Sequence, residues 1–441
     1  MEAYAAMDKL SYDIFSLLES KFLFGPAGGC LSGPGTPAKA FLGRSGGRVR
    51  VLSIDGCGAG AAEDALLAAA ALARLEAGLR EQSGDPDARV AEFFDVAAGA
   101  GAGGVLASML FLRGPDGRPR YSAQEALAFV AANTGKDWGS RRGRYWAKLF
   151  LGGARSAERS LHRVFGDATL RDTVAPLLVP CYDLATGAQF MFSRADFVES
   201  DAFDFRLRDV CAATCAAGSV PAVVRSVDGR TAIAATSAGV AGMGNPTAAA
   251  ITHVLHNKQE FPLATGVEDI MVLSIGDGAS SSSKGSSTLV ATRSPSPREL
   301  ARVTAEGVAD MVDESVAMAF GHTCGSNYIR VQAAKESTPL QAETAAAAAR
   351  AMLAQRNVES VLFRGRRLSE RTNAEKVYAL VADLLKEQER RRRSPLPNVA
   401  IKQVDTTSPR LSLATTASSF TTTPMSTVST MPSPASCNSR R

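Results

Sequence analysis

Two glycine-rich turns have the residue types and spacing that suit chemistry best. The first is Asp55–Gly60 (DGCGAG), which follows an apolar run and precedes an Ala/Leu-rich stretch. Small residues let backbone N–H groups approach a ligand, and a following helix N-terminus favours negative charge there. The turn therefore suits a phosphate or an oxyanion. It has no Lys for a P-loop, and Ala61 departs from the dinucleotide-binding glycine pattern.

The second turn, Gly99–Gly103 (GAGAG), has the spacing of a nucleophile elbow, G-x-S-x-G, with Gly101 in the place of the serine. At an elbow the central residue holds a strained backbone conformation, so that its side chain projects over the edge of a sheet. Glycine adopts such angles without strain. We therefore expect the elbow shape to persist, although Gly101 has no oxygen that could attack a substrate.

Each turn must be positioned by a strand before it and a helix after it. Such strands are expected at 48–54 and 93–97, and such helices at 62–80 and 104–112. Strand, tight turn and helix in repetition are typical of parallel β-α-β units, whose crossovers bring the turns to the carboxyl edge of one sheet. Further strands are expected at 176–182, 189–192, 231–235, 270–275 and 327–331, and further helices at 207–217, 246–257, 298–320, 340–355 and 373–392. The predicted fold is a three-layer α/β/α sandwich with a mainly parallel central sheet.

The composition is that of a soluble globular protein of 441 residues, 45% apolar and 21% charged. It contains no run of about 18 apolar residues, and Asp8 and Asp13 stand where a secretory signal would be basic or apolar. A cytoplasmic location is expected. The seven cysteines have no disulfide or zinc spacing, so we expect reduced thiols, no metal and no cofactor. Of the net charge of +5, residues 390–441 carry +7, and the body therefore lacks the basic surface of a nucleic-acid-binding protein.

Three regions are expected along the chain. Residues 1–47 hold an amphipathic helix at 6–24, suited to packing on the core or to a membrane surface, and a Gly/Pro-rich connector. Residues 48–393 form the globular domain. Residues 394–441, rich in Ser, Thr and Pro, are expected to be disordered because they bury little apolar area. The helix expected before this tail ends in a basic cluster, which suits a peripheral anionic membrane contact or simply a solvated helix end: Arg390, Arg391, Arg392 and Arg393.

Three ordered motifs resemble those of the patatin-like lipid acyl hydrolases. Val51–Gly58 (VLSIDGCG) is similar to the family's oxyanion loop, D-G-G-G-x-R-G. Residues 93–106 are similar to the elbow motif F-D-x-x-x-G-x-S-x-G-G, and residues 235–247 (ATSAGVAGMGNPT) to the region of the D-G-[GA] motif and N-P-T. Residues 248–262 and 327–330 fit a plant subgroup with Gly for the elbow serine. The resemblance spans about 48–392 and implies a patatin-like domain that acts on acyl esters of membrane lipids.

The resemblance also implies a catalytic dyad, an elbow Ser as nucleophile and an Asp of D-G-[GA] as its base. Both positions are changed here. The nucleophile position is Gly101 and the base position is Ser237, whose neutral hydroxyl is a poor base. The sequence therefore predicts that no intact catalytic dyad is present.

The oxyanion loop is partly kept, and it holds one candidate substitute. The positions that match the family are Asp55, Gly56 and Gly58. Cys57 replaces a glycine, and Gly60 replaces the arginine. A thiol at a helix N-terminus can have a depressed pKa, which makes Cys57 a candidate, although a small residue tolerated in place of glycine is the simpler interpretation. Asp277, after an expected strand, is the best-placed spare carboxylate, with a turn residue as its alternative.

Other polar residues near the motifs are weaker candidates. Ser108 lies about two helical turns beyond Gly101, too far from the elbow. Asp95 ends the strand expected before the elbow and is expected to fix the turn. His253 and His256 share an expected helix and suit packing or surface roles.

Three functional hypotheses remain. The first is a catalytically impaired or inactive lipid acyl hydrolase that binds lipid or regulates lipid metabolism. The second is a weak, non-specific acyl hydrolase acting on phospholipids and galactolipids, and the third is an interaction protein acting through its tail. We favour the first, because losing a serine nucleophile costs about 10⁶ in kcat, while binding and an oxyanion hole leave roughly 10³–10⁴ over water.

Overall fold

The computed structural model describes residues 47–56, 61–133, 154–216, 222–239, 242–276, 296–332, 345–361, 365–394 and 399–400. The helix expected at 6–24 lies outside these residues, as does nearly all of the expected disordered tail at 394–441. Both therefore stay predictions.

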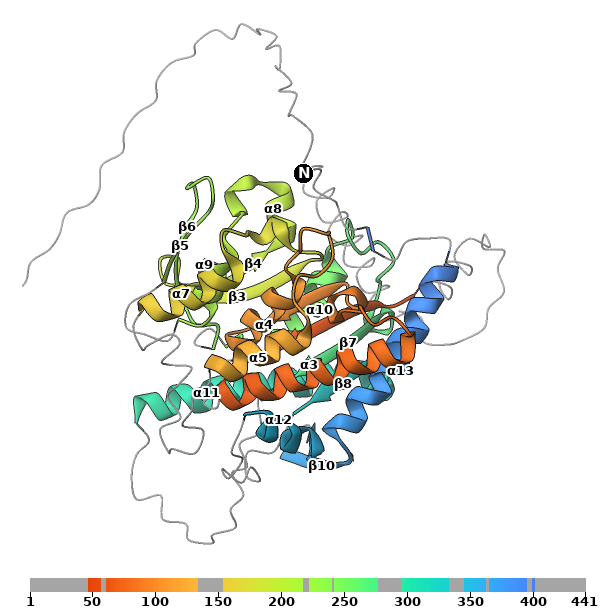
Figure 1. Cartoon of the computed structure of the whole chain (residues 1–441). Helices are drawn as coiled ribbons and strands as arrows, with labels where there is room; N and C mark the ends of the chain where they lie inside the picture. The colour runs from red at the N-terminus through yellow and green to blue at the C-terminus, as the bar shows by residue number, and fades with distance from the viewer. Residues whose placement is uncertain are drawn as a thin grey trace, which may run out of the picture. The chain divides into compact units, whose positions relative to one another are not determined.

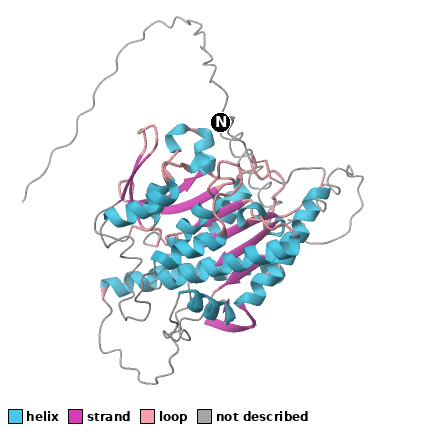
Figure 2. Ribbon diagram, viewed as in Figure 1, coloured by secondary structure: helices cyan, strands magenta, loops and turns pink. Residues whose placement is uncertain are grey.

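Within the described residues, an eight-stranded mixed sheet forms the middle layer of the fold (Figures 1 and 2). Its order is β5-β6-β3-β2-β1-β7-β8, and β4 also pairs with β3. The strands are β1 (Val49–Ile54), β2 (Val96–Gly99), β3 (Leu177–Asp183), β4 (Ala188–Ser193), β5 (Ala222–Arg225), β6 (Ala232–Thr236), β7 (Ile270–Ile275) and β8 (Tyr328–Val331). β3, β2, β1, β7 and β8 pair in parallel, and β4, β5 and β6 join by antiparallel pairing. The carboxyl ends of the five parallel strands therefore share one edge, as predicted.

Helices cover both faces of this sheet. One face packs against α3 (Ala61–Ser83), α4 (Ala102–Phe111), α5 (Ala123–Asn133), α7 (Ala154–Phe165), α9 (Leu207–Thr214), α12 (Ala345–Ala354) and α13 (Asn373–Arg393). The other face packs against α10 (Thr247–His256) and α11 (Pro297–Phe320). On β1, Leu52 and Ile54 face the first layer, while Val49 and Val51 face the second. This burial on both faces explains the continuous apolar run of β1 and confirms the three-layer α/β/α fold.

Smaller elements complete the described part. The short helix α8 (Arg194–Glu199) follows β4, and β9 (Arg356–Val361) pairs with β10 (Gly365–Thr372) in a separate antiparallel hairpin. None of the described helices is both long and apolar enough to cross a membrane.

The strand expected at 93–97 is misplaced, and this changes the role of Asp95. Val90–Phe93 forms a short 3-10 helix, and β2 begins only at Val96. The apolar residues Phe93 and Phe94 pack in the helical layer and do not belong to a strand. Asp95 therefore precedes β2 at the amino edge of the sheet, a strand's length from the elbow.

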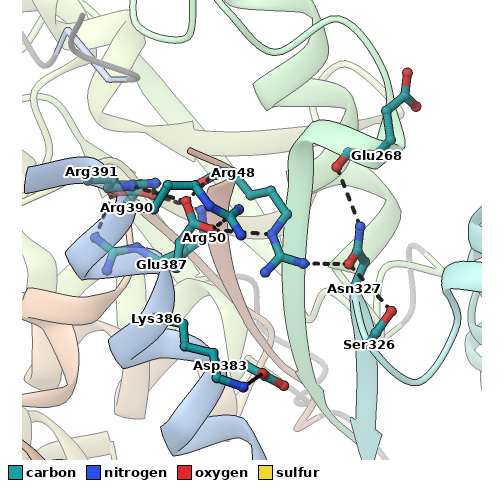
Figure 3. A network of polar contacts seen from close by, with 11 residues as sticks. Arg48, Arg50, Glu268, Ser326, Asn327, Asp383, Lys386, Glu387, Arg390 and Arg391 are labelled. Atoms are coloured by element: carbon teal, nitrogen blue, oxygen red, sulfur yellow. Dashed lines mark hydrogen bonds and ion pairs between the residues drawn. The ribbon is translucent and has the colours of Figure 1, made fainter. Parts of the chain in front are cut away.

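At this amino edge, buried ion pairs fasten the end of α13 to the sheet (Figure 3). Arg391 donates to both oxygens of the Asp95 carboxylate, at 2.7 and 2.6 Å, and the backbone N–H of Arg50 donates to it at 2.7 Å. Burial raises the pKa of Asp95, but the charges of Arg50 and Arg391 outweigh it and hold the pKa below its usual value. Glu387, also buried, accepts from the backbone N–H of Arg48 at 2.5 Å. Asp95 thus anchors α13 instead of fixing the elbow turn.

Candidate active site

The elbow between β2 and α4 is present, with Gly101 at its apex. Gly101 has φ 55° and ψ −124°, a left-handed conformation that a residue with a side chain adopts only under strain. α4 begins at the next residue, Ala102, and the N–H of Val105 donates to the Gly101 carbonyl at 3.2 Å. The backbone therefore keeps the shape that would present a nucleophile, at a position without a side chain.

The glycines on either side of the apex are required by close backbone packing. A Cβ at Gly99 would lie within 3.0 Å of the backbone of Gly103 and Gly104. A Cβ at Gly103 would lie within 3.0 Å of the Ile54 and Asp55 carbonyl oxygens. Any larger residue would push β2, α4 and the end of β1 apart. These two glycines thus hold the elbow against β1.

The oxyanion loop begins directly against the elbow. The Gly56 carbonyl accepts from the N–H of Ala102 at 3.2 Å, and a Cβ at Gly56 would lie within 3.0 Å of the Gly103 nitrogen. The start of the first glycine turn therefore meets the second turn at the carboxyl edge, as the repeated strand–turn–helix pattern predicted. Cys57, Gly58 and Gly60 lie outside the described residues, so the place of the Cys57 thiol stays a prediction.

Thr214, at the end of α9, links the elbow to the loop that holds Ser237. The N–H of Gly101 donates to Thr214 Oγ1 at 2.9 Å, and the Thr214 carbonyl accepts from the N–H of Ala238 at 3.4 Å. The Ser237 hydroxyl accepts from the N–H of Gly239 at 3.2 Å. The nucleophile and base positions thus lie on either side of one buried threonine. No sequence motif pointed to Thr214.

Beneath the oxyanion loop lies a buried ionic network centred on Arg330 of β8. Its guanidinium donates to Asp55 Oδ2 at 2.8 Å and to Ser274 Oγ at 2.6 Å, and Nε lies 3.4 Å from Asp313 Oδ2. Tyr328 donates to Asp313 Oδ1 at 2.5 Å. Burial lowers the pKa of Arg330, but the charges of Asp55 and Asp313 more than offset this and raise it well above its usual value. Arg330 is therefore a permanent buried cation that holds the first residue of the oxyanion loop.

A cluster of hydroxyls joins this network to the start of α10. Thr247 donates to Ser53 Oγ at 2.9 Å, and its Oγ1 lies 3.1 Å from Ser274 Oγ. Asn245 accepts from the N–H of Thr247 at 3.1 Å and donates to the Ala309 carbonyl of α11 at 3.3 Å. The N-P-T segment at 245–247 is therefore a structural link between β1, β7, α10 and α11.

Comparisons with known proteins agree with this architecture. Residues 52–251 match a family model described as Patatin-like phospholipase. Patatin-like protein 3 of Oryza sativa subsp. japonica is 53% identical over 398 residues, which cover 88% of this chain and 92% of the relative. Patatin-like protein 7 of Arabidopsis thaliana is 41% identical, covering 90% and 84%. The Arabidopsis thaliana protein named "Probable inactive patatin-like protein 9" is 37% identical, covering 86% and 93%.

This chain belongs to the patatin-like phospholipase family. Within that family's frame, the described part of the site has the elbow and the start of the oxyanion loop. It has Gly101 and Ser237 where the resemblance implied the Ser and Asp of the dyad. Asp277 lies outside the described residues.

The weaker candidates of this patatin-like protein lie away from the elbow apex. Ser108 is wholly buried within α4, and burial raises the pKa of the neighbouring Cys211 thiol to about 12. Burial likewise raises the pKa of Cys181 to about 12, and both thiols are free, as predicted. The ring of His253 contacts the ring of Phe261 in an edge-to-face geometry.

Among the described residues, no group of three or more His, Cys, Asp or Glu could hold a metal ion.

A cavity of about 790 Å³ lies at the outer edge of β8, between the β9–β10 hairpin and α13. Charged side chains make up much of its lining, including Asp313, Arg330, Glu359, Arg367 and Lys376. Arg330 reaches from this cavity to Asp55, so the cavity and the oxyanion loop share one buried cation.

Proposed function

We propose that this patatin-like protein binds membrane lipids, with a role in lipid metabolism or its regulation, and that it lacks efficient acyl-hydrolase activity. The observation that carries this proposal is Gly101 at the elbow apex, with φ 55° and no side chain. An acyl-enzyme requires a nucleophilic oxygen or sulfur at this point and a base within about 3.2 Å of it. Gly101 supplies no nucleophile, and the hydroxyl of Ser237 is a poor base.

The remaining parts of the site support binding rather than turnover. The elbow and Gly56 form a packed backbone frame, with the Asp55–Arg330 ion pair behind Gly56, and we propose that the ester group of a lipid binds against this frame. Removal of the nucleophile leaves the packed core intact, because the apolar lining of an acyl pocket belongs to the fold and not to the dyad. Phospholipid or galactolipid is the ligand class that the family implies.

A weak acyl hydrolase is the second candidate, because the left-handed elbow geometry persists at Gly101. In that case Cys57 or Asp277 would have to supply the missing chemistry. The purified protein assayed on a fluorogenic acyl ester decides between the two candidates. We expect a rate close to the buffer blank, unchanged by Cys57→Ala or Asp277→Ala. A rate that exceeds the blank by several orders of magnitude and falls in either variant would favour the hydrolase.

We also propose that the basic cluster at the end of α13 contacts anionic membranes peripherally. Of its four arginines, we assign this contact to Arg392 and Arg393. Arg391 is engaged with Asp95 and Arg390 with Glu387. Arg392 and Arg393 are 71% and 78% exposed, and both pair with Glu389 at the surface. Exposed pairs of this kind are weak, which leaves these two side chains able to exchange partners.

A further inference from the structure

Between Leu300 and Ala319, the exposed residues of α11 whose side chains the structure describes are all uncharged. These residues follow helical spacing and define one outward face of the helix: Leu300, Val303, Thr304, Gly307, Val308, Met311, Ser315, Met318 and Ala319. The large apolar members are more than half exposed at four positions, Leu300 (52%), Val303 (56%), Met311 (53%) and Met318 (62%). A surface helix normally places its charged residues on this side and its apolar residues on the other. We call the nine residues the α11 face.

The opposite side of α11 is firmly packed, so the apolar outward face is not the result of a misplaced helix. Val316 and Phe320 are buried against the sheet. Asp313, one turn earlier, accepts the hydroxyl of Tyr328 and pairs with Arg330. The charged residues Glu306, Asp310 and Glu314 are only partly exposed. They follow one another four residues apart, which places Glu314 next to Met311 and Met318 at the border of the face. In Figure 1, the visible end of α11 projects beyond the end of α3.

The first half of the α11 face lies near the candidate active site. α11 follows the carboxyl end of β7 and precedes β8, so its first half lies towards the edge that carries the elbow. Gly242, in the loop between Ser237 and α10, approaches Val308, and Asn245 of the same loop donates to the Ala309 carbonyl. On the other side of Ser237, the β5–β6 hairpin exposes Val223 (62%) and Val227 (53%). Large exposed apolar side chains therefore flank the segment that holds the base position.

We propose that the α11 face docks on the surface of a neutral lipid bilayer and brings the elbow edge towards the lipid. This inference rests on the proposed lipid-binding function. A helix lying in a membrane interface buries its apolar face at the level of the headgroups, and an uncharged row from Leu300 to Met318, about 27 Å long, suits that geometry. A second copy of the chain is a poorer occupant, because a standard protein interface takes about 20–30 residues a side and this face has nine.

The test is sedimentation of the full-length protein with phosphatidylcholine vesicles. We expect Met311→Gln with Met318→Gln to weaken vesicle binding by about tenfold or more, since each thioether loses favourable burial. The matched control is Leu368→Gln with Tyr378→Gln, which changes two exposed apolar residues on β10 and α13 (55% and 48% exposed) and should leave binding unchanged. Binding should also be insensitive to salt, because the face carries no charge.

Three results would overturn the inference. The first is that the wild-type protein does not bind the vesicles. The second is that the α11 variant binds them as well as the control variant does. The third is that the α11 variant is a monomer where the wild-type protein is a dimer. Binding that appears only after removal of residues 1–46 would also overturn it, since the amphipathic segment would then cover the face. Calorimetry with a short-chain phosphatidylcholine below its micelle concentration tests lipid binding at the elbow without a membrane surface. If the monomeric lipid gives no heat of binding while the vesicles are still bound, the proposed function is wrong and the inference about the α11 face still holds.

Discussion

At the residue scale, the site is defined by what Gly101 and Ser237 lack. The elbow holds Gly101 in a left-handed conformation, and the loop of Ser237 is tied to it through Thr214. The elbow therefore remains, with Gly101 and Ser237 at the positions that the resemblance assigns to nucleophile and base. This arrangement allows the frame and the chemistry to be tested independently.

Restoring the dyad should restore activity only in part. Gly101→Ser places a side chain at φ 55° and should cost about 1–3 kcal/mol of stability. Ser237→Asp supplies a base, which must lie within about 3.2 Å of the new hydroxyl. We expect neither single variant to raise esterase kcat/KM much, and the pair to raise it measurably, because nucleophile and base act together.

The matched control is Gly101→Ala with Ser237→Asp, which carries the backbone strain and the carboxylate without a nucleophile. It should show the same loss of thermal stability as the restored pair and no gain in activity. A wild-type rate equal to that of the restored pair would contradict the proposal that the natural protein is catalytically impaired.

Thr214 is the functional neighbour that sequence reasoning missed. Its hydroxyl accepts from the N–H of Gly101 inside a wholly buried site. Thr214→Val keeps the shape but leaves this N–H without its acceptor, which should cost about 1–3 kcal/mol of unfolding free energy in urea denaturation. Thr214→Ser keeps the hydroxyl and should cost clearly less. Equal losses in the two variants would show that packing, not the hydrogen bond, matters here.

At the element scale, strands that form an apolar run between turn signals were the easiest to predict. β7 (Ile270–Ile275) was expected with these same bounds, and β1, β3, β4, β6 and β8 within one residue at either end, because each is an apolar run between turn signals. β10 (GRRLSERT) and β9 were missed because they are short, polar strands at a surface hairpin. β2 was shifted because Phe93 and Phe94 lie next to it in sequence while packing in the helical layer.

The ion pairs that join these elements could not be predicted from the sequence, because their partners are far apart along it. Arg330 and Asp55 are 275 residues apart, and Arg391 and Asp95 are 296 apart. Local periodicity places an Arg on a strand or at a helix end, but it cannot name the carboxylate that three-dimensional packing brings to it. The motif N-Y-I-R indicated family membership, and only the fold gave its Arg a role.

Arg330 should be essential for the stability of the oxyanion edge. Arg330→Met leaves Asp55 and Asp313 buried without their counter-charge, and the expected loss of unfolding free energy is about 3–5 kcal/mol. The control Arg367→Met removes an exposed pair with Glu359 and should change the unfolding free energy little. Urea denaturation of both variants measures the difference, and similar small losses would mean that Arg330 is dispensable.

The anchor of α13 should make stability depend on pH in a predictable direction. The folded pKa of Asp95 lies below its usual value, because the charges of Arg50 and Arg391 outweigh the effect of burial. Its contribution to stability is then fully present above the unfolded pKa, about 3.9, and is lost as the pH falls through the lower folded value. Asp95→Asn should therefore be markedly less stable than wild type at pH 7, and the gap should narrow below about pH 4. A gap of constant size between pH 7 and pH 3 would contradict this role.

At the scale of the whole molecule, the two surfaces that we propose as membrane contacts lie differently with respect to the sheet. Arg391 is bound to Asp95, which precedes β2, so Arg392 and Arg393 follow at the amino edge. The elbow and the first half of the α11 face lie at the carboxyl edge. A bilayer bound through the basic cluster would face away from the elbow, whereas one bound through the α11 face would lie along the strand direction, with the first half of that face at the elbow edge. The two contacts therefore differ both in the orientation they impose and in their physical origin.

Salt distinguishes these two contacts. Arg392→Gln with Arg393→Gln should weaken binding to anionic vesicles by up to about thirtyfold at low ionic strength, since each charge near such a surface contributes about 1 kcal/mol. The effect should fade at high salt, and binding to neutral vesicles should not change. The α11 variant should behave in the opposite way, with a loss on neutral vesicles that salt does not alter. Anionic binding that ignores both salt and the two Arg substitutions would remove the basic cluster as a membrane contact, and the α11 face alone would then orient the protein.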